Sequence, residues 1–452
     1  MPPRSETAGS ALAREARLTA RGVLRGDRLV DPEGNTLIVD GFASSLFEAA
    51  AGAGVADLLA AAEDPEAAYA ALSVLVLAGM LESDPAPTLP SRPAPTLASR
   101  PPVTLVFVCY NGAPGLPGLL RSIRAQDYPA LQAVVVDNAS TDGSRELLEA
   151  AGSPFEAVLL ESNRGFAGAF NAGLARASGE WIAILNTDVE LAPDAVSAWV
   201  ARALERPDAG AVAAKMLLAS NPRFINSLGN SILPRDWGSD NFMGVLDAGQ
   251  FDAQQEVFSA CFGAALLSRK ALEQVGPPDP GYFLYYEDTD WCYRARLGGF
   301  PIVVAPRCLV RHQFGGSVGD RPWHFKLRLV ARNRMRFTLL NLGGRALGGY
   351  LWSYLRLDAQ QLARSLIRRQ RDDFLAYARA YRDLLLEAPG LLAGRRTRRR
   401  LKSPRLAEED ILALNVVPRV HAHAGSEARL TEAVVREWYL AVFPLSPGSG
   451  IR

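Results

Sequence analysis

Residues 103–205 alternate short apolar runs with segments of helical periodicity, and this alternation limits the folds that the chain can adopt. Four apolar runs, VTLVFVCY, LQAVVVD, FEAVLLE and WIAILN, are each followed by segments with helical spacing of apolar residues, such as SRELLEAAG and APDAVSAWVARALE. A continuous apolar run of this kind is typical of a strand buried on both faces. Because the connecting loops are short, the pattern predicts an α/β domain whose parallel sheet is wound in βαβ units.

Three of the apolar runs end in polar residues, and these ends predict where a ligand binds. They read CYNG (109–112), VDNASTDGS (136–144) and LNTDVE (185–190). Ligands of open α/β sheets bind outside the carboxyl ends of the strands, so the three groups are expected to face one crevice. The chain has no GxGxxG after its first strand and no GxxxxGK[ST], which argues against a Rossmann dinucleotide site and a P-loop.

Single residues at these ends suggest chemistry but leave alternatives open. Asp137 is placed to accept a hydrogen bond from a base or a ribose, although Ser140 and Asp142 after it are also what a turn and a helix cap require. Asp188, at the end of a buried strand, is suited to hold Mg²⁺ or Mn²⁺ on a diphosphate. A lone histidine is more often structural, but His312 follows an apolar run and precedes a glycine-rich turn, which favours a ligand role.

The stretch YYEDTDW (285–291) places Glu287, Asp288 and Asp290 beside aromatic residues. Close carboxylates repel one another. The cluster is therefore a solvated surface run, a cation site, or a site where one carboxylate acts as a base. The stretch by itself does not distinguish these interpretations.

Taken in order, the motifs between about 103 and 340 resemble those of one enzyme family. CYNG, VDNASTDGS, NRGFAGAFNAG, LNTDVE, FGAALLSRKALEQVG, YFLYYEDTDWCYR and RHQFGGS look like the motifs of family 2 inverting glycosyltransferases with a GT-A fold, of the bacterial rhamnosyltransferase-like and galactofuranosyltransferase-like group. The resemblance implies a nucleotide-diphospho-sugar transferase domain over residues 103–325. It does not extend to the first 100 residues.

The resemblance also implies roles for individual residues. The positions that match donor-binding residues are Tyr110, Asp137, Arg164 and Asn171. Asp188 and His312 match the family's site for a divalent cation, Mg²⁺ or Mn²⁺, whereas Asn186 stands where the metal motif usually has its first aspartate. In the acidic motif we take Asp288 as the catalytic base and Glu287 and Asp290 as its orienting partners.

These roles imply transfer of a sugar from a nucleoside-diphosphate sugar to a hydroxyl of a glycan, a glycolipid or another cell-envelope acceptor. A cation neutralises the leaving diphosphate, and a carboxylate on the opposite face of the sugar takes the acceptor proton, which gives inversion. Family analogy favours dTDP-rhamnose as donor. Two alternatives are a non-catalytic sugar-nucleotide-binding or glycan-binding GT-A module and a sugar-nucleotide nucleotidyltransferase. The second would normally carry lysine or arginine in the loop CYNGAPGLPG, which has neither.

The flanking segments predict further parts of the molecule. Residues 84–102 contain seven prolines, which is typical of an extended linker, and they separate a small α+β module (1–83, winged-helix-like or PqqD-like) from the transferase domain. Helical, arginine-rich segments make up residues 326–452. They include a half-apolar helix at 337–355 and the basic run GRRTRRRLK (394–402), which is either a solvated face or a site for anionic lipid headgroups.

Charge and cysteine usage exclude some classes of protein. The net charge of +1 provides no field that would select nucleic acid, so no nucleic-acid partner is expected. Four scattered cysteines without CxxC spacing argue against a zinc ribbon and a disulfide scaffold and fit a reducing cytosol. We expect neither a signal peptide nor a spanning helix, because the chain has no apolar h-region and no apolar run of 18 residues. The expected location is the cytoplasm, with peripheral contact of the protein with an anionic membrane.

Overall fold

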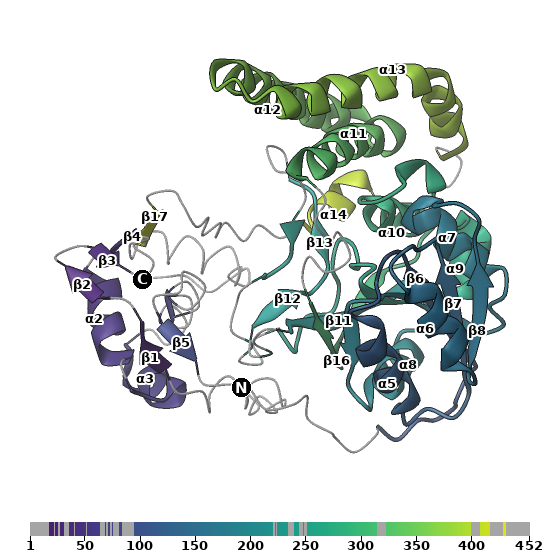
Figure 1. Ribbon diagram of the computed structural model, residues 1–452, viewed down its shortest axis with the longest axis horizontal. Helices are drawn as coiled ribbons and strands as arrows, with labels where there is room; N and C mark the ends of the chain where they lie inside the picture. Colours follow the sequence, from purple (N-terminus) through teal and green to yellow (C-terminus); the bar gives the residue numbers. More distant parts are fainter. Residues whose placement is uncertain are drawn as a thin grey trace.

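The structure is a computed structural model (Figure 1). It describes residues 95–219, 251–313 and 322–398 continuously, together with parts of 18–83 and of 222–247 and the segments 407–415 and 428–430. Residues 84–94 of the expected linker and residues 399–402 of the basic run lie outside the described residues.

The predicted strand–helix alternation forms one half of a large central sheet. Strands β8, β7, β6 and β9 lie side by side in that order and run parallel to one another. The strands and helices of this half are β6 (Val103–Cys109), α5 (Leu116–Arg124), β7 (Leu131–Asp137), α6 (Ser144–Ala151), β8 (Phe155–Leu159), α7 (Gly165–Leu174) and β9 (Trp181–Asn186). Every residue of β6 is buried, as expected for a central strand with both faces covered. In the sheet register Cys109 pairs with Asp137 and Val108 with Asn186, so the polar strand ends meet at one edge, as predicted.

The other half of the sheet is mixed, which the alternation did not predict. Beyond β9 the order continues with β15 (Ala264–Ser268) and β11 (Ala211–Leu218), then β16 (Ile302–His312) and β10 (Val189–Leu191). β15 runs antiparallel to both of its neighbours, and β10 runs antiparallel to β16. Short strands β12 (Ile225–Ser227), β13 (Asn230–Ser231) and β14 (Ser239–Asp240) lie near this half, as do helices α8 (Ala195–Glu205), α9 (Arg269–Val275) and α10 (Glu287–Leu297) and the 3₁₀ turn at Pro280–Tyr282. This mixed sheet is the GT-A-like α/β fold that the motifs implied.

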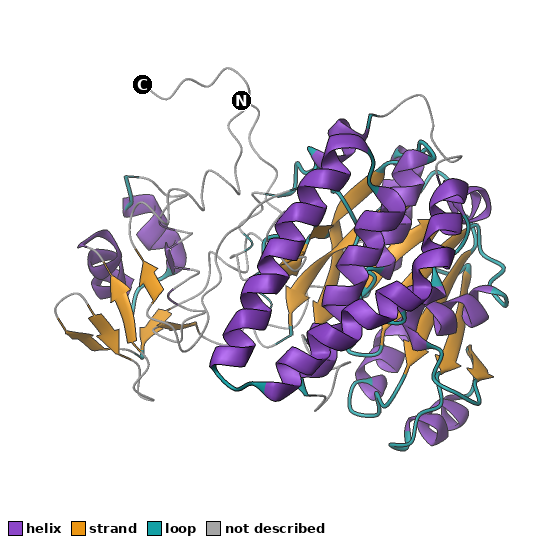
Figure 2. Cartoon of the chain, turned by 90° about the horizontal axis from the view of Figure 1, so that it is seen from above, coloured by secondary structure: helices purple, strands orange, loops and turns teal. Residues whose placement is uncertain are grey.

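The C-terminal region is helical, as predicted. Its helices are α11 (Trp323–Asn341), α12 (Gly344–Ile367), α13 (Arg371–Arg398) and α14 (Glu408–Leu412), and Figure 2 shows the long ones lying side by side across the sheet. The expectation of one helix over 337–355 was wrong, because Leu342 and Gly343 have extended backbone and separate α11 from α12. Among the helices that the structure describes, none has the length and hydropathy needed to cross a bilayer.

A second apolar core joins the helical region to the sheet domain. It contains Tyr282, Tyr293, Phe337, Tyr354 and Leu384, contributed by α10 and its preceding turn and by α11, α12 and α13. Ion pairs between α11 and its neighbours add to this interface: Arg334 pairs with the buried Asp358 on α12, and Arg328 with Asp383 on α13. Several arginines of the helical region are therefore structural rather than solvated.

The N-terminal module is a small α+β unit. Its strands are β1 (Leu18–Ala20), β2 (Val23–Arg25), β3 (Arg28–Val30), β4 (Thr36–Val39) and β5 (Leu81–Ser83), with helices α2 (Gly41–Ala50) and α3 (Val55–Ala61). A strand from the far end of the chain, β17 (Ala428–Leu430), pairs in parallel with β4. The division of the chain at residues 83, 102 and 325 stays a prediction, and β17 shows that the C-terminal segment also contributes to the N-terminal sheet.

Candidate functional site

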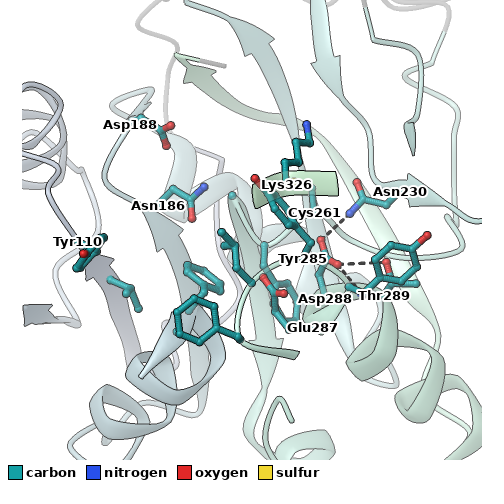
Figure 3. A pocket seen from close by; sticks show the side chains of 18 of the residues that line it. Tyr110, Asn186, Asp188, Asn230, Cys261, Tyr285, Glu287, Asp288, Thr289 and Lys326 are labelled. Atoms are coloured by element: carbon teal, nitrogen blue, oxygen red, sulfur yellow. Dashed lines mark hydrogen bonds between the residues drawn. The ribbon is translucent and has the colours of Figure 1, made fainter. Parts of the chain in front are cut away.

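A cavity of about 420 Å³ lies at the carboxyl ends of β6 and β9, next to the first turn of α10. Five of the nine candidate catalytic, donor-binding and metal residues line it: Tyr110, Asp188, Glu287, Asp288 and His312. Figure 3 shows Tyr110, Asn186 and Asp188 on one side of the cavity and Glu287 and Asp288 on the other. The strand ends and the acidic cluster, which are far apart in the chain, therefore face the same space.

The remaining donor-site candidates do not line this cavity in the part of the chain that the structure describes. The Asp137 side chain is fully buried, and the guanidinium of Arg145 donates from Nε to its Oδ2 at 3.0 Å. Arg164 is exposed at the start of α7, and the Asn171 side-chain amide donates to the carbonyl of Pro278 at 2.9 Å. Their roles in donor binding stay predictions.

Asn138, next to Asp137, does line the cavity and connects the second strand end to α7. Its side-chain Nδ2 donates to Asn163 Oδ1 at 3.0 Å, and its Oδ1 accepts from the backbone N–H of Arg164 at 2.8 Å. Gly165, the first residue of α7, has φ +71°, and a side chain there would collide with the carbonyl of Phe283. Glycine therefore allows α7 to approach the loop before α10.

Asp188 and His312 lie together, as predicted for a metal site. Antiparallel pairing of β10 with β16 sets Val189 opposite His312, which brings His312 Nε2 to 3.4 Å from Asp188 Oδ1. His312 Nδ1 is 2.7 Å from Asn226 Oδ1, and a hydrogen bond donated from Nδ1 to this amide oxygen orients the ring so that Nε2 faces Asp188.

One carboxylate oxygen and one imidazole nitrogen at this separation fit two ligands of a divalent cation. The described residues contain no group of three or more His, Cys, Asp or Glu side chains arranged to hold a metal ion. The other ligands would be water and diphosphate oxygens, with the amide of Asn186 in the same cavity lining.

Asp288 is held at the cavity wall by hydrogen bonds to both carboxylate oxygens. Asn230 Nδ2 donates to Oδ2 at 2.6 Å, and the backbone N–H of Thr289 donates to Oδ1 at 2.6 Å. Both Glu287 and Asp288 lie in the first turn of α10, where the helix dipole favours negative charge. Asp288 is half-buried, so its carboxylate is oriented by the protein and open to a ligand.

Burial and nearby negative charge raise the pKa values of Glu287 and Asp288 by different amounts. Burial, together with the charge of Asp288, raises the pKa of Glu287 to about 8. Burial also raises the pKa of Asp288 to about 6, although hydrogen bonds from Thr289 lower it and the nearby Asp240 raises it. The pair therefore holds one proton at neutral pH, and Asp288 is the member that is mainly ionised.

Asp290 lies in a different environment from its two neighbours. It is fully buried behind the cavity, where Arg294 Nε donates to it at 2.9 Å, Tyr282 OH at 2.9 Å and Asn341 Nδ2 at 2.8 Å, and Arg398 forms a further ion pair. Burial alone would raise its pKa, but Arg398 and Arg294 hold the pKa of Asp290 well below its usual range. Residues two apart on a helix do not face each other, which explains why Asp290 does not adjoin Asp288.

The loop before α10 is strained and is held by one side chain from α11. Phe283, Tyr285 and Tyr286 have φ values of +65°, +71° and +72°, a region that residues with side chains seldom adopt. The fully buried Asn333 donates from Nδ2 to the carbonyls of Tyr282, Leu284 and Tyr285 at 2.9, 2.8 and 2.8 Å. Since residues 283–286 line the cavity, Asn333 fixes the wall next to Asp288.

Several cavity residues were missed by sequence reasoning. Asn230, Asp240 and Cys261 come from segments without a readable pattern, and Lys326 comes from the start of α11. Lys326 Nζ lies 5.7 Å from the centre of the Tyr285 ring, a cation–π contact. Only the α11 residues had a signal in the sequence: Lys326, Val330 and Asn333 are spaced at i, i+4 and i+7, which places them on one face of a helix.

Parts of this chain are similar to known glycosyltransferases. Residues 104–276 match the family model for glycosyl transferase family 2. The N-acetylglucosaminyl-diphospho-decaprenol L-rhamnosyltransferase of Mycobacterium tuberculosis is 25% identical over 295 residues, which cover 59% of this chain and 94% of that protein. Succinoglycan biosynthesis protein ExoO of Rhizobium meliloti is 37% identical over 107 residues, covering 24% of this chain and 30% of that protein.

Among solved structures, the mannosyltransferase of Pyrobaculum calidifontis in complex with GDP-Man and Mn²⁺ has a TM-score of 0.43 and 20% identity, covering 74% of this chain and 96% of that one. TarS 1–349 of S. aureus in complex with UDP has a TM-score of 0.36 and 17% identity, and the match covers 62% of this chain and 91% of that one. The family match spans the strand ends and Asp188. The chain therefore carries a glycosyl transferase family 2 domain over residues 104–276.

Proposed function

We propose that this protein transfers a sugar from a nucleoside-diphosphate sugar to an acceptor hydroxyl with inversion at the anomeric carbon. The observation that carries the proposal is the placement of the Asp288 carboxylate in the same cavity as the Asp188–His312 pair. One side of the cavity offers ligands for a cation on a diphosphate, and the other offers a base. This is the arrangement that a single in-line displacement needs.

In this step Asp288 accepts the proton of the acceptor hydroxyl as its oxygen bonds to the anomeric carbon. The bond from that carbon to the diphosphate oxygen breaks, and its electron pair leaves with the nucleoside diphosphate. Asn230 and Thr289 keep the Asp288 carboxylate in place, and a pKa of about 6 leaves it ionised at neutral pH while still basic enough to take a proton. Glu287, protonated at that pH, adds no second negative charge beside it.

Asp188 and His312 would hold Mg²⁺ or Mn²⁺ on the donor diphosphate, and the ion when bound neutralises the charge that develops on the leaving group. Lys326 adds a positive charge in the same cavity. For the nucleotide itself we keep Tyr110, which lines the cavity, and propose Asp137, Arg164 and Asn171 as residues that act from its rim or from behind it.

For the substrates we propose an activated sugar such as dTDP-rhamnose and a glycan or lipid-linked acceptor of the cell envelope. The support comes from the rhamnosyltransferase on a diphospho-decaprenol carrier and the succinoglycan biosynthesis protein among the similar proteins. GDP-mannose and UDP-sugars are the other donors to consider, since GDP-Man and UDP occupy structures with lower similarity. We also propose a cytoplasmic location with contact at the membrane surface.

A donor panel tests this function. The full chain is incubated with Mn²⁺ and dTDP-rhamnose, GDP-mannose, UDP-glucose or UDP-N-acetylglucosamine, and released nucleoside diphosphate is measured with and without a polyprenyl-diphosphate-linked sugar. We expect release from one donor and its acceleration by the acceptor. Donor binding without release from any member of the panel would instead indicate a non-catalytic sugar-nucleotide-binding module.

A further inference from the structure

The two outermost helices of the C-terminal region carry large apolar side chains on their solvent side. We call the surface formed by the exposed residues of α12, α13 and the turn between them the outer face. Trp352 on α12 is 70% exposed and Ile367 is 81% exposed, although both are among the most apolar side chains. The other exposed large apolar residues of the outer face are Leu355, Leu366, Leu385, Leu386 and Leu392.

The spacing along α12 shows that this exposure belongs to one face of the helix. Along α12, exposed residues follow one another at intervals of two helical turns: Trp352, Ala359 and Leu366. Tyr350, Tyr354 and Asp358 are buried on the other side, against the rest of the protein. The inner side of α12 is thus apolar, as packing requires. Its outer side is apolar as well, and packing among the described residues does not account for that.

The charges of the outer face are almost all positive. The exposed charged residues between 344 and 398 include one carboxylate, Asp372, and nine arginines: Arg345, Arg356, Arg364, Arg368, Arg369, Arg371, Arg379, Arg382 and Arg396. Three of the other four carboxylates of this region are engaged by arginines: Asp358 by Arg334, Asp383 by Arg328 and Arg382, and Glu387 by Arg332 and Arg336. The fourth, Asp373, is half-buried beside Asp372 at the start of α13. Apart from these two aspartates, the acidic side chains of the region pair with arginines, and arginine and apolar side chains face out.

We propose that the outer face of α12 and α13 is the surface by which this protein lies on an anionic lipid bilayer. A helix in the interface plane of a membrane combines Trp and Leu, which enter the acyl boundary, with arginines, which bind the headgroups. A protein partner would need acidic residues to match the nine arginines, and an anionic bilayer offers that charge over the whole length of both helices. The long arginine stems also allow the charged groups to reach the headgroups beside the apolar residues.

This surface includes one described arginine of the basic run, the exposed Arg396, whereas two others of the run are engaged within the protein. Arg398 is buried and pairs with Asp290 and Asp279, and Arg395 donates to the carbonyl of Leu339. These two arginines hold α13 against α10 and α11, so they are engaged within the protein. The proposed lipid contact therefore comprises α12, the turn at 368–370 and the exposed side of α13, Arg396 included.

The outer face also lies close to the cavity. α11 provides Lys326 and Val330 to the cavity lining and packs against both α12 and α13. Because packed helices lie about 8–10 Å apart, the cavity is about one helix layer from the outer face. A lipid-linked acceptor held at the outer face would therefore have a short path to Asp288. This consequence rests on the proposed function.

Vesicle co-sedimentation of the full chain tests the proposal. The probes are vesicles of phosphatidylcholine alone and vesicles that also contain phosphatidylglycerol, at low and at high salt and without donor or acceptor. We expect binding to the anionic vesicles at low salt and release at high salt. The triple variant Arg356→Gln, Arg364→Gln, Arg368→Gln should lower the partition coefficient on the order of 100-fold, since each arginine near an anionic surface contributes about fivefold. Trp352→Ser should weaken binding further.

A matched triple variant, Arg121→Gln, Lys270→Gln, Arg307→Gln, removes the same charge from exposed positions on the sheet domain and should leave binding unchanged. The proposal is overturned if the wild-type chain does not bind anionic vesicles, or if both triple variants lose binding equally. It is also overturned if light scattering shows a dimer that Trp352→Ser dissociates, because the outer face would then contact a second copy. Nucleoside-diphosphate release from soluble donor should be the same in all variants, so a failure of the transferase reaction is seen separately.

Discussion

Replacing the candidate base by its amide isostere, Asp288→Asn, is the most direct test of the site. The change removes the ability to take a proton and keeps the size of the side chain. The local contacts tolerate it: Asn230 donates to Asp288 Oδ2, and Asn230 Oδ1 has no hydrogen-bond partner among the described residues. A rotation of the Asn230 amide would let Oδ1 accept from the new N–H₂, so we expect the variant to fold.

The expected loss follows from the role of the carboxylate. General base catalysis contributes about 10²–10⁴-fold, which corresponds to about 3–5 kcal/mol of the activation barrier. We therefore expect kcat to fall by that factor in Asp288→Asn. Donor affinity should change little, because Asp188 lies on the other side of the cavity (Figure 3) and His312 adjoins Asp188.

The assay is acceptor-dependent release of nucleoside diphosphate, with donor affinity measured separately by calorimetry. Glu287→Gln is the matched control: it removes the neighbouring carboxyl group and mimics the protonated state that Glu287 has at neutral pH. We expect that variant to keep most of its activity at pH 7. Near-normal turnover of a folded Asp288→Asn protein, or equal losses in the two variants, would refute the assignment of Asp288 as the base.

Three further predictions concern protonation, metal and support of the site. Because the pKa of Asp288 is raised to about 6 and the base acts when ionised, kcat/KM should rise with pH and reach half its plateau near pH 6; a midpoint near 4 contradicts this. Dialysis against EDTA should abolish transfer, and His312→Ala should weaken Mn²⁺ binding, measured by calorimetry, about 10-fold or more; full activity in EDTA would exclude the metal site. Asn333→Leu removes the donor to three loop carbonyls, of which that of Tyr282 still accepts from the backbone N–H of Leu284, so the other two lose their partner at about 1–3 kcal/mol each. The variant should lower the melting temperature and kcat while the donor Kd stays the same; an unchanged kcat would show that Asn333 is not needed to hold the cavity wall.

The local pattern of the chain was sufficient to predict the sheet edge and much of the cavity. Apolar runs ending in polar residues placed Tyr110 and Asp188 at one edge, because parallel strands connected by short loops share a direction. The motif resemblance added His312 and the Glu287–Asp288 pair, which line the same cavity. These predictions succeeded because strand ends and helix starts depend on neighbouring residues and on a period that can be read along the chain.

Contacts between distant segments had no such signal. Asp290 differs from Asp288 because Arg398, 108 residues later, reaches its carboxylate, and Asn230 reaches Asp288 across 58 residues. Asn333 holds a loop about 50 residues before it, and nothing in the composition of either segment indicates that pairing. A side chain's partner, its pKa and its exposure depend on which surfaces fold together. The packing of the helices therefore placed Glu287 and Asp288 at the cavity and Asp290 in a buried ion-pair cluster, and turned the arginines of α11 inward and those of α12 outward.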